Sequence, residues 1–161
     1  MLLVMHMKSN SLVCDILNYI DSNINKEITI NELSIIFFFD KTYIMKRFKK
    51  ELGITIHEYI NISRIYNSLS CFDKDTYFLS IAIKNGFNSL EYFSETFKKI
   101  MGVSPTIYKK FVLRNIDVSL ESSSTIFRNI SSITKTKSKI SKYLSNKVPN
   151  TPPVKKISLF M

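Results

Sequence analysis

Apolar residues recur every three or four positions through most of residues 12–110, which is the spacing of amphipathic α-helices. The stretch SLVCDILNYIDSNI predicts an opening helix with Val13, Ile16, Leu17 and Ile20 on one stripe. Strand signals are weak, because the β-branched residues follow helical spacing and glycine-bearing hairpin turns are absent. The predicted fold class is all-α, with about seven helices.

The sequence repeats itself at an interval of 49 residues. The matched positions are Tyr43 with Tyr92, Phe48-Lys49-Lys50 with Phe97-Lys98-Lys99, Gly53 with Gly102, Ile54 with Val103, and Tyr59 with Tyr108. Each copy has the pattern of two short helices joined by a tight turn, and its glycine is expected to end the second helix. The predicted helix-turn-helix units cover about residues 29–52 and 76–101, and a linking helix covers about residues 56–72.

Polar residues with capping chemistry precede the predicted helices. The expected N-caps are Thr29, Asp40, Thr55, and either Asn88 or Ser89. Thr29 and Thr55 are each followed three positions later by Glu, which completes a capping box. These signals place helix starts at the same points as the apolar pattern does.

The run IIFFF, residues 35–39, stands directly before a strongly basic segment. We expect residues 35–37 to end a supporting helix, Phe38 and Phe39 to make the turn, and residues 40–51 to form a recognition helix. Ile44 and Phe48 lie four apart and are expected to point inward. The opposite face is predicted to carry Lys41, Thr42, Met45, Lys46 and Lys49.

Charge favours an anionic partner, because 23 Lys and Arg stand against 13 Asp and Glu, a formal net charge of +10. Nucleic acid is expected ahead of a membrane surface. Residues 111–161 hold nine of the basic residues and two of the acidic ones, and they are rich in Ser, Thr, Asn and Lys. This composition predicts a mostly disordered basic tail with at most a short helix near residues 138–145. Residues 1–11 are assigned to an N-terminal extension.

Catalytic and metal-binding patterns are missing from the sequence. His6 and His57 are isolated, and the three glycines are all explained as turns or helix stops. Cys14 and Cys71 fit free thiols in a reducing compartment. No apolar run approaches the length of a membrane span, so we expect a cytoplasmic protein with no cofactor, no metal and no enzymatic activity.

The second copy carries the most specific motif. In IAIKNGFNSLEYFSETFKKIMGVSPTIYKK, residues 81–110, the elements I-A, G-F, Y-F, F-K-K, G-V-S-P and Y resemble the signature of the AraC/XylS family of bacterial transcription regulators. The first copy keeps part of this order in Tyr43-Ile44, Phe48-Lys49-Lys50, Gly53, Tyr59-Ile60 and Arg64. The resemblance spans about residues 12–110 and corresponds to the DNA-binding domain of that family, two helix-turn-helix units joined by a linking helix.

That resemblance implies a sequence-specific regulator of transcription, most often an activator, that acts on double-stranded DNA at the nucleoid and contacts RNA polymerase. A monomer with two recognition helices in successive major-groove segments is expected, with a dimer as the alternative. The chain begins where the family's DNA-binding domain begins, so it resembles either the stand-alone members or a fragment of a longer one.

The resemblance also places the site residues. The base-contacting positions fall on Thr42, Met45 and Lys46 in the first unit and on Leu90, Glu91 and Glu95 in the second; the backbone contacts fall on Lys41, Lys49, Lys50 and Lys98. The first recognition helix has a net charge of +3 and the second has none. We therefore expect the first unit to supply most of the base readout and the second mainly to position the domain, with a binding affinity that falls steeply as salt rises.

Three departures from the family pattern leave alternatives open. Phe38 stands where a small residue is usual in the turn, Arg47 replaces an apolar residue, and Glu95 replaces a basic one. These features also fit a protein-binding module that kept the fold but lost DNA recognition, with Glu91 and Glu95 on an ordinary solvated face. A third reading treats residues 111–161 as a segment that binds membrane surfaces.

Overall fold

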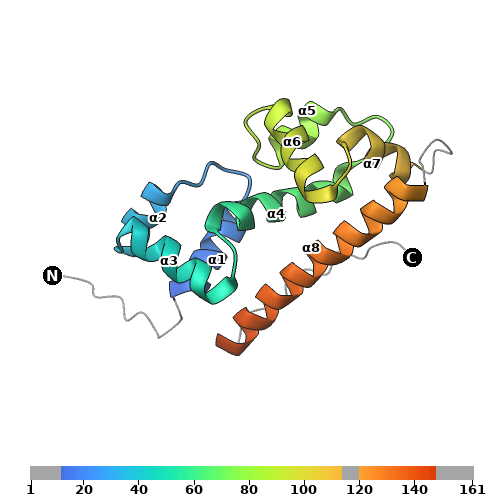
Figure 1. Cartoon of the computed structure of the whole chain (residues 1–161). Helices are drawn as coiled ribbons and strands as arrows, with labels where there is room; N and C mark the ends of the chain where they lie inside the picture. Colours follow the sequence, from blue (N-terminus) through green and yellow to red (C-terminus); the bar gives the residue numbers. More distant parts are fainter. Residues whose placement is uncertain (1–11, 114–119, 148–161) are drawn as a thin grey trace.

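The computed structural model describes residues 12–113 and 120–147, and within these ranges it contains helices and no strand. The α-helices are α1 (Leu12–Ser22), α2 (Ile30–Phe37), α3 (Lys41–Leu52), α4 (Ile56–Ser68), α5 (Phe78–Lys84), α6 (Leu90–Met101), α7 (Pro105–Val112) and α8 (Leu120–Lys147), with a short 3-10 helix, η1 (Leu69–Cys71), after α4. Figure 1 shows two helical groups, α1–α3 and α5–α7, joined by α4, with α8 running along both. The all-α prediction is confirmed.

The first unit packs α1, α2 and α3 around one apolar core. The α1 stripe of Val13, Ile16, Leu17 and Ile20 is fully buried, as predicted. It meets Leu33 from α2 and Ile44 and Phe48 from α3, all with no exposed surface. This core holds α3 by one side and leaves its opposite side open.

The second unit repeats the plan with an aromatic core. Phe87, Phe93 and Phe97 form a chain of ring contacts, with centroids 5.2 Å apart for the first pair and 5.6 Å apart for the second. Tyr108 of α7 packs on Phe97 with a centroid distance of 5.4 Å. The 12-residue helices α3 and α6 begin 49 positions apart, and so do α4 and α7. The repeat read from the sequence is thus a structural repeat.

Helix ends follow the predicted capping chemistry. Thr29 and Thr55 each complete a capping box, with Glu32 and Glu58 respectively. Asp40 accepts hydrogen bonds from the backbone N–H groups of Thr42 and Tyr43 at 2.8 and 3.3 Å. In the second copy the cap is Ser89, which accepts from the N–H of Tyr92 at 3.1 Å.

The linking helix is shorter and more polar on its buried side than its sequence pattern indicates. It was predicted at about residues 56–72, whereas α4 ends at Ser68 and a 3-10 turn follows. Tyr59 and Ile65 are buried, and the buried side also contains Ser63, Arg64 and Ser68. Polar groups are tolerated there because each has a hydrogen-bond partner. Arg64 and Ser63 are bonded to neighbouring elements, and the Ser68 hydroxyl donates to the Ile65 carbonyl oxygen within α4.

Residues 120–147 differ from the predicted tail. We expected mostly disorder with at most a short helix near residues 138–145, and the structure has the 28-residue helix α8 instead. Its three fully or nearly buried isoleucines, Ile126, Ile133 and Ile140, are spaced seven apart and pack on both cores. A stripe this sparse is weak evidence for a helix on its own, because the stability comes from the surface it covers. The first two residues of the predicted tail, 111 and 112, belong to α7. Residues 114–119 and 148–161 of that tail, and the whole N-terminal extension, lie outside the described residues.

Candidate nucleic-acid interface

The turn between α2 and α3 is tight and strained. Phe38 adopts a left-handed backbone conformation, with φ 56° and ψ 35°, and its side chain is 92% exposed. The Ser34 hydroxyl donates to the Phe39 carbonyl oxygen at 2.7 Å and closes the turn. Asp40 then starts α3, and the N–H groups of Thr42 and Tyr43 hold the pKa of its carboxyl below the usual value. The prediction that Phe38 and Phe39 form the turn is confirmed.

Helix α3 presents the predicted polar face to solvent. Ile44 and Phe48 are fully buried, which anchors the helix by one side. The side chains expected to contact DNA are all exposed: Lys41, Thr42, Met45, Lys46, Lys49 and Lys50. Arg47 forms an ion pair with Glu51 one turn later, along the flank of the helix rather than on this face. A ridge of this kind, with methyl groups among lysines, has the size and chemistry to enter a major groove.

Helix α6 offers a different surface. Glu91, Glu95 and Lys98 are exposed, as their assignment requires. Leu90 is not fully available, because it is half-buried and packs against the second core. The exposed part of α6 therefore carries two carboxylates ahead of its basic last turn, which contains Lys98 and Lys99.

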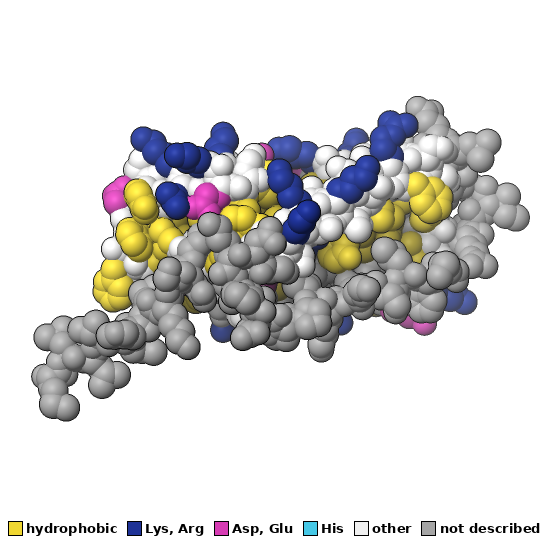
Figure 2. Space-filling view, turned by 90° about the horizontal axis from the view of Figure 1, so that it is seen from below, with side chains coloured by type: hydrophobic (Ala, Val, Ile, Leu, Met, Phe, Trp, Pro, Cys, Tyr) yellow, Lys and Arg dark blue, Asp and Glu magenta, His cyan; other side chains and the backbone are white. Residues whose placement is uncertain are grey.

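Lysine and arginine side chains lie along the whole length of one edge in Figure 2, and apolar side chains gather at the end where α2 and α3 lie. The large exposed apolar residues of that region are Ile35, Ile36, Phe38, Phe39, Tyr43 and Met45. Glu58, which opens α4, sits within range of Lys49 and Lys99. Its hydrogen bonds from Thr55 lower its pKa, and these two lysines lower it further. Lysines from the last turns of both α3 and α6 thus act electrostatically on the start of α4.

His57 is exposed, and its ring nitrogens lie 3.1 Å from the Tyr92 hydroxyl and 3.4 Å from the Asn61 amide nitrogen. Within residues 12–113 and 120–147, no three His, Cys, Asp or Glu side chains are grouped as metal ligands. Over the same ranges, no helix combines the length and the apolar character needed to span a bilayer. His6 lies outside the described residues.

Arg64 has a structural role that the sequence does not predict. Arg64 is 8% exposed; it donates to the Ile24 carbonyl oxygen at 2.9 Å and to the Lys26 carbonyl oxygen at 2.6 Å. Desolvation by burial lowers the pKa of its guanidinium. The loop that accepts these bonds belongs to the first unit, while the guanidinium carbon lies 5.8 Å from the centroid of Phe87 in the second. A single Arg inside an amphipathic helix gives no sequence signal of such a role.

Comparison with known proteins relates this arrangement to helix-turn-helix domains. A family model described as a helix-turn-helix domain matches residues 33–110. The transcriptional regulatory protein HptR of Staphylococcus aureus is 35% identical over 98 residues, which is 61% of this chain and 39% of HptR. The chain spans about two fifths of the length of the curated relatives it matches.

Solved structures agree with this match. The C-terminal domain of AraT, a response regulator from Geobacillus stearothermophilus, superposes with a TM-score of 0.60 at 25% identity, covering 65% of this chain and 88% of that one. The DNA-binding domain of AdpA, a global transcriptional factor solved in complex with a target DNA, has a TM-score of 0.59 at 15% identity, covering 66% and 98%. The second likeness shows the fold alone.

Proposed function

Residues 33–110 form an AraC-type helix-turn-helix domain, and from that premise we propose that the protein is a sequence-specific, double-stranded DNA-binding regulator of transcription. In this proposal α3 and α6 enter successive major-groove segments of one site. The observation that carries it is the exposed polar and basic face of α3, held in place by two fully buried anchors, Ile44 and Phe48.

The first recognition helix supplies most of the base readout. The side chains of Thr42 and Met45 end in methyl groups that fit the thymine methyl, and the Lys46 ammonium can donate to the O6 and N7 acceptors of guanine. Lys41, Lys49 and Lys50 flank these three residues and contact phosphates. The Lys46 contact carries the greatest share of discrimination, because a charged donor to guanine is the most specific of the three.

The second recognition helix mainly positions the domain. Of its assigned base-contacting residues, Glu91 and Glu95 are exposed and Leu90 is half-buried, so its contribution to specificity is smaller. A carboxylate near phosphates reduces affinity unless it accepts from cytosine N4. Lys98 supplies the backbone contact that offsets this repulsion.

The test is a gel shift with DNA selected by the unmodified protein. Lys46→Ala is expected to weaken specific binding by about 1–3 kcal/mol, roughly 5- to 150-fold, because a bidentate base contact is lost. Glu95→Ala is expected to leave specific binding intact or to strengthen it. Abolition of binding by Glu95→Ala, with Lys46→Ala retaining full affinity, would reverse the assigned roles of the two helices.

The mode of regulation follows from the same proposal. Two recognition helices in one chain need no dimer symmetry, so a monomer on an asymmetric site is the state we propose. Activation would come from contact between the bound domain and RNA polymerase.

A second function is favoured by the apolar surface at the first turn. Phe38 is 92% exposed and Ile35 is 73% exposed, beside the half-exposed Phe39. Exposed apolar patches of this kind often mark protein interfaces. A module that binds protein instead of DNA would show no protected site in footprinting, whereas a specific DNA binder protects one.

A further inference from the structure

Helix α8 contacts both helix-turn-helix units with one face. Ile126 and Ile133 belong to the core of the second unit, and Ile140 belongs to the core of the first, where Tyr143 packs beside it. Residues seven apart lie on the same side of a helix, so one straight stripe spans the junction. The two cores are thereby attached to a single rigid element.

The two ends of this stripe meet the C-terminal ends of the two recognition helices. The Tyr143 hydroxyl donates to Glu51 in the last turn of α3. At the other end, Thr125 and Asn129 pack against Gly102, which ends α6; a Cβ atom at Gly102 would lie 2.6 Å from Thr125 Cγ2 and 2.7 Å from Asn129 Nδ2. Asn129 and Tyr143 are separated by roughly 21 Å of helix, at about 1.5 Å per residue.

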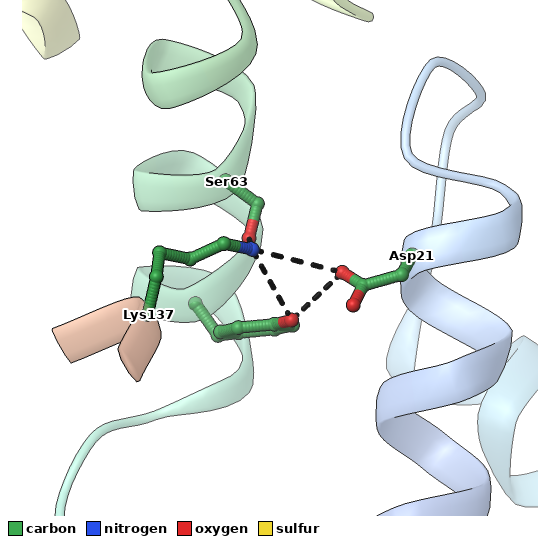
Figure 3. A network of polar contacts seen from close by, with 4 residues as sticks. Asp21, Ser63 and Lys137 are labelled. Atoms are coloured by element: carbon green, nitrogen blue, oxygen red, sulfur yellow. Dashed lines mark hydrogen bonds and ion pairs between the residues drawn. The ribbon is translucent and has the colours of Figure 1, made fainter. Parts of the chain in front are cut away.

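A partly buried lysine fixes the middle of α8. Figure 3 shows Lys137 between Ser63 of α4 and Asp21 of α1. Its Nζ donates to Ser63 Oγ at 2.9 Å and to the Tyr59 hydroxyl at 3.5 Å, and it lies 3.9 Å from Asp21 Oδ1. The Tyr59 hydroxyl in turn donates to Asp21 at 2.7 Å. The network joins α1, α4 and α8 in a direction that apolar packing alone does not specify.

Helix α8 holds the two units together, and we call it the brace. It leaves free the face of α3 that carries Thr42, Met45 and Lys46. Glu51, which contacts α8, follows Thr42 by nine residues, or about two and a half turns, and so lies on the opposite side of α3. The exposure of Thr42, Met45 and Lys46 agrees with this geometry. A contact at the back of a recognition helix can set its direction without competing with DNA.

We propose that α8 fixes the separation and relative direction of α3 and α6. The protein is thereby restricted to DNA sites with one spacing between the segment that α3 contacts and the segment that α6 contacts. The proposal rests on the DNA-binding function for its consequence, but not for its structural part. If Lys137 is prevented from holding α8, the two units should sample several relative positions, and the competent arrangement should become a smaller fraction of the population.

The first experiment measures the joint between the units without DNA. Spin labels are placed on the exposed positions Asn31→Cys of α2 and Lys84→Cys of α5, in a chain with Cys71→Ala. Cys14 has no exposed surface, so we expect no label there. Lys137→Glu puts a second carboxylate beside Asp21. Lys135→Glu makes the same charge change at an exposed position of α8 and is the matched control. A narrow distance distribution is expected for the unmodified chain and the control, and a broad one for Lys137→Glu.

The second experiment repeats the selection of bound sequences from random DNA with the same variants. The unmodified chain and Lys135→Glu should return one spacing, and Lys137→Glu two or more, with about tenfold weaker binding than the control if the competent arrangement falls to a tenth of the population. Ile140→Ala, which removes an apolar contact with the first core without changing charge, should also broaden both readouts; it decides the matter if Lys137→Glu does not fold.

The outcomes distinguish a failure of the proposal for α8 from a failure of the proposed DNA-binding function. A narrow label distribution and a single DNA spacing in both Lys137→Glu and Ile140→Ala, with normal helix content, would overturn the brace and leave DNA binding untouched. Broadened label distances with no DNA selected by any variant would uphold the brace and reject the function.

Discussion

Phe38 holds a conformation that phenylalanine rarely adopts, with φ 56° and a side chain that contacts little of the protein. Within the described residues it is the only residue other than glycine with positive φ. The left-handed region disfavours side chains with a Cβ by about 1–2 kcal/mol, except for short polar ones such as Asn. The strain is stored beside the residues assigned to base contacts, where strained backbone is often functional.

Phe38→Asn should raise the free energy of unfolding by about 1 kcal/mol, because Asn tolerates the left-handed conformation and little buried surface is lost. Urea unfolding followed by circular dichroism measures the change. Ile35→Asn is the control, since it also replaces a largely exposed apolar residue but sits in helical backbone near the end of α2. An unchanged or lowered stability for Phe38→Asn would show that the ring contributes contacts that offset the strain.

At the scale of elements, α3 and α6 end in the same way but face different surroundings. Gly53 and Gly102 have φ of 78° and 73°, and each N–H donates to a lysine carbonyl oxygen one turn back. A Cβ at Gly53 would meet nothing within 4 Å, whereas one at Gly102 would collide with two side chains of α8. The same substitution therefore isolates the contribution of α8 packing.

Gly53→Ala should cost about 1 kcal/mol of unfolding free energy, from the backbone conformation alone. Gly102→Ala should cost more, by about 1–3 kcal/mol, because Thr125 is β-branched and α8 has to shift to make room. Thermal or urea unfolding of the two variants provides the comparison. Equal losses would mean that α8 does not pack on the end of α6 as described.

Local sequence signals located these elements well. The caps at Thr29, Asp40 and Thr55, the glycine stops and the buried pair Ile44 and Phe48 all follow from chemistry within one or two turns of helix, and each is confirmed. The sequence does not decide between Asn88 and Ser89 as the cap of α6, because both side chains can accept from the first turn. The partial burial of Leu90 does not follow from local signals, since it depends on a core made by residues far along the chain.

At the scale of the whole molecule, the joint between the two units could not be read from the sequence. Arg64 and Lys137 lie in sequence typical of solvated helix faces, and their hydrogen-bond partners lie 38 to 78 residues away. Helix α8 has few apolar residues and many Ser, Thr and Lys, a composition typical of disorder. The helix is stabilised because its stripe of isoleucines packs on the two cores.

We propose that this molecule reads DNA sequence chiefly through α3. The most direct measurement is selection of bound sequences from random double-stranded DNA by the full chain and by Lys46→Ala. We expect one enriched motif for the unmodified chain, with loss of preference at a guanine position in Lys46→Ala and little change elsewhere in the motif. No enriched motif for the full chain, or an identical motif for the variant, would contradict it.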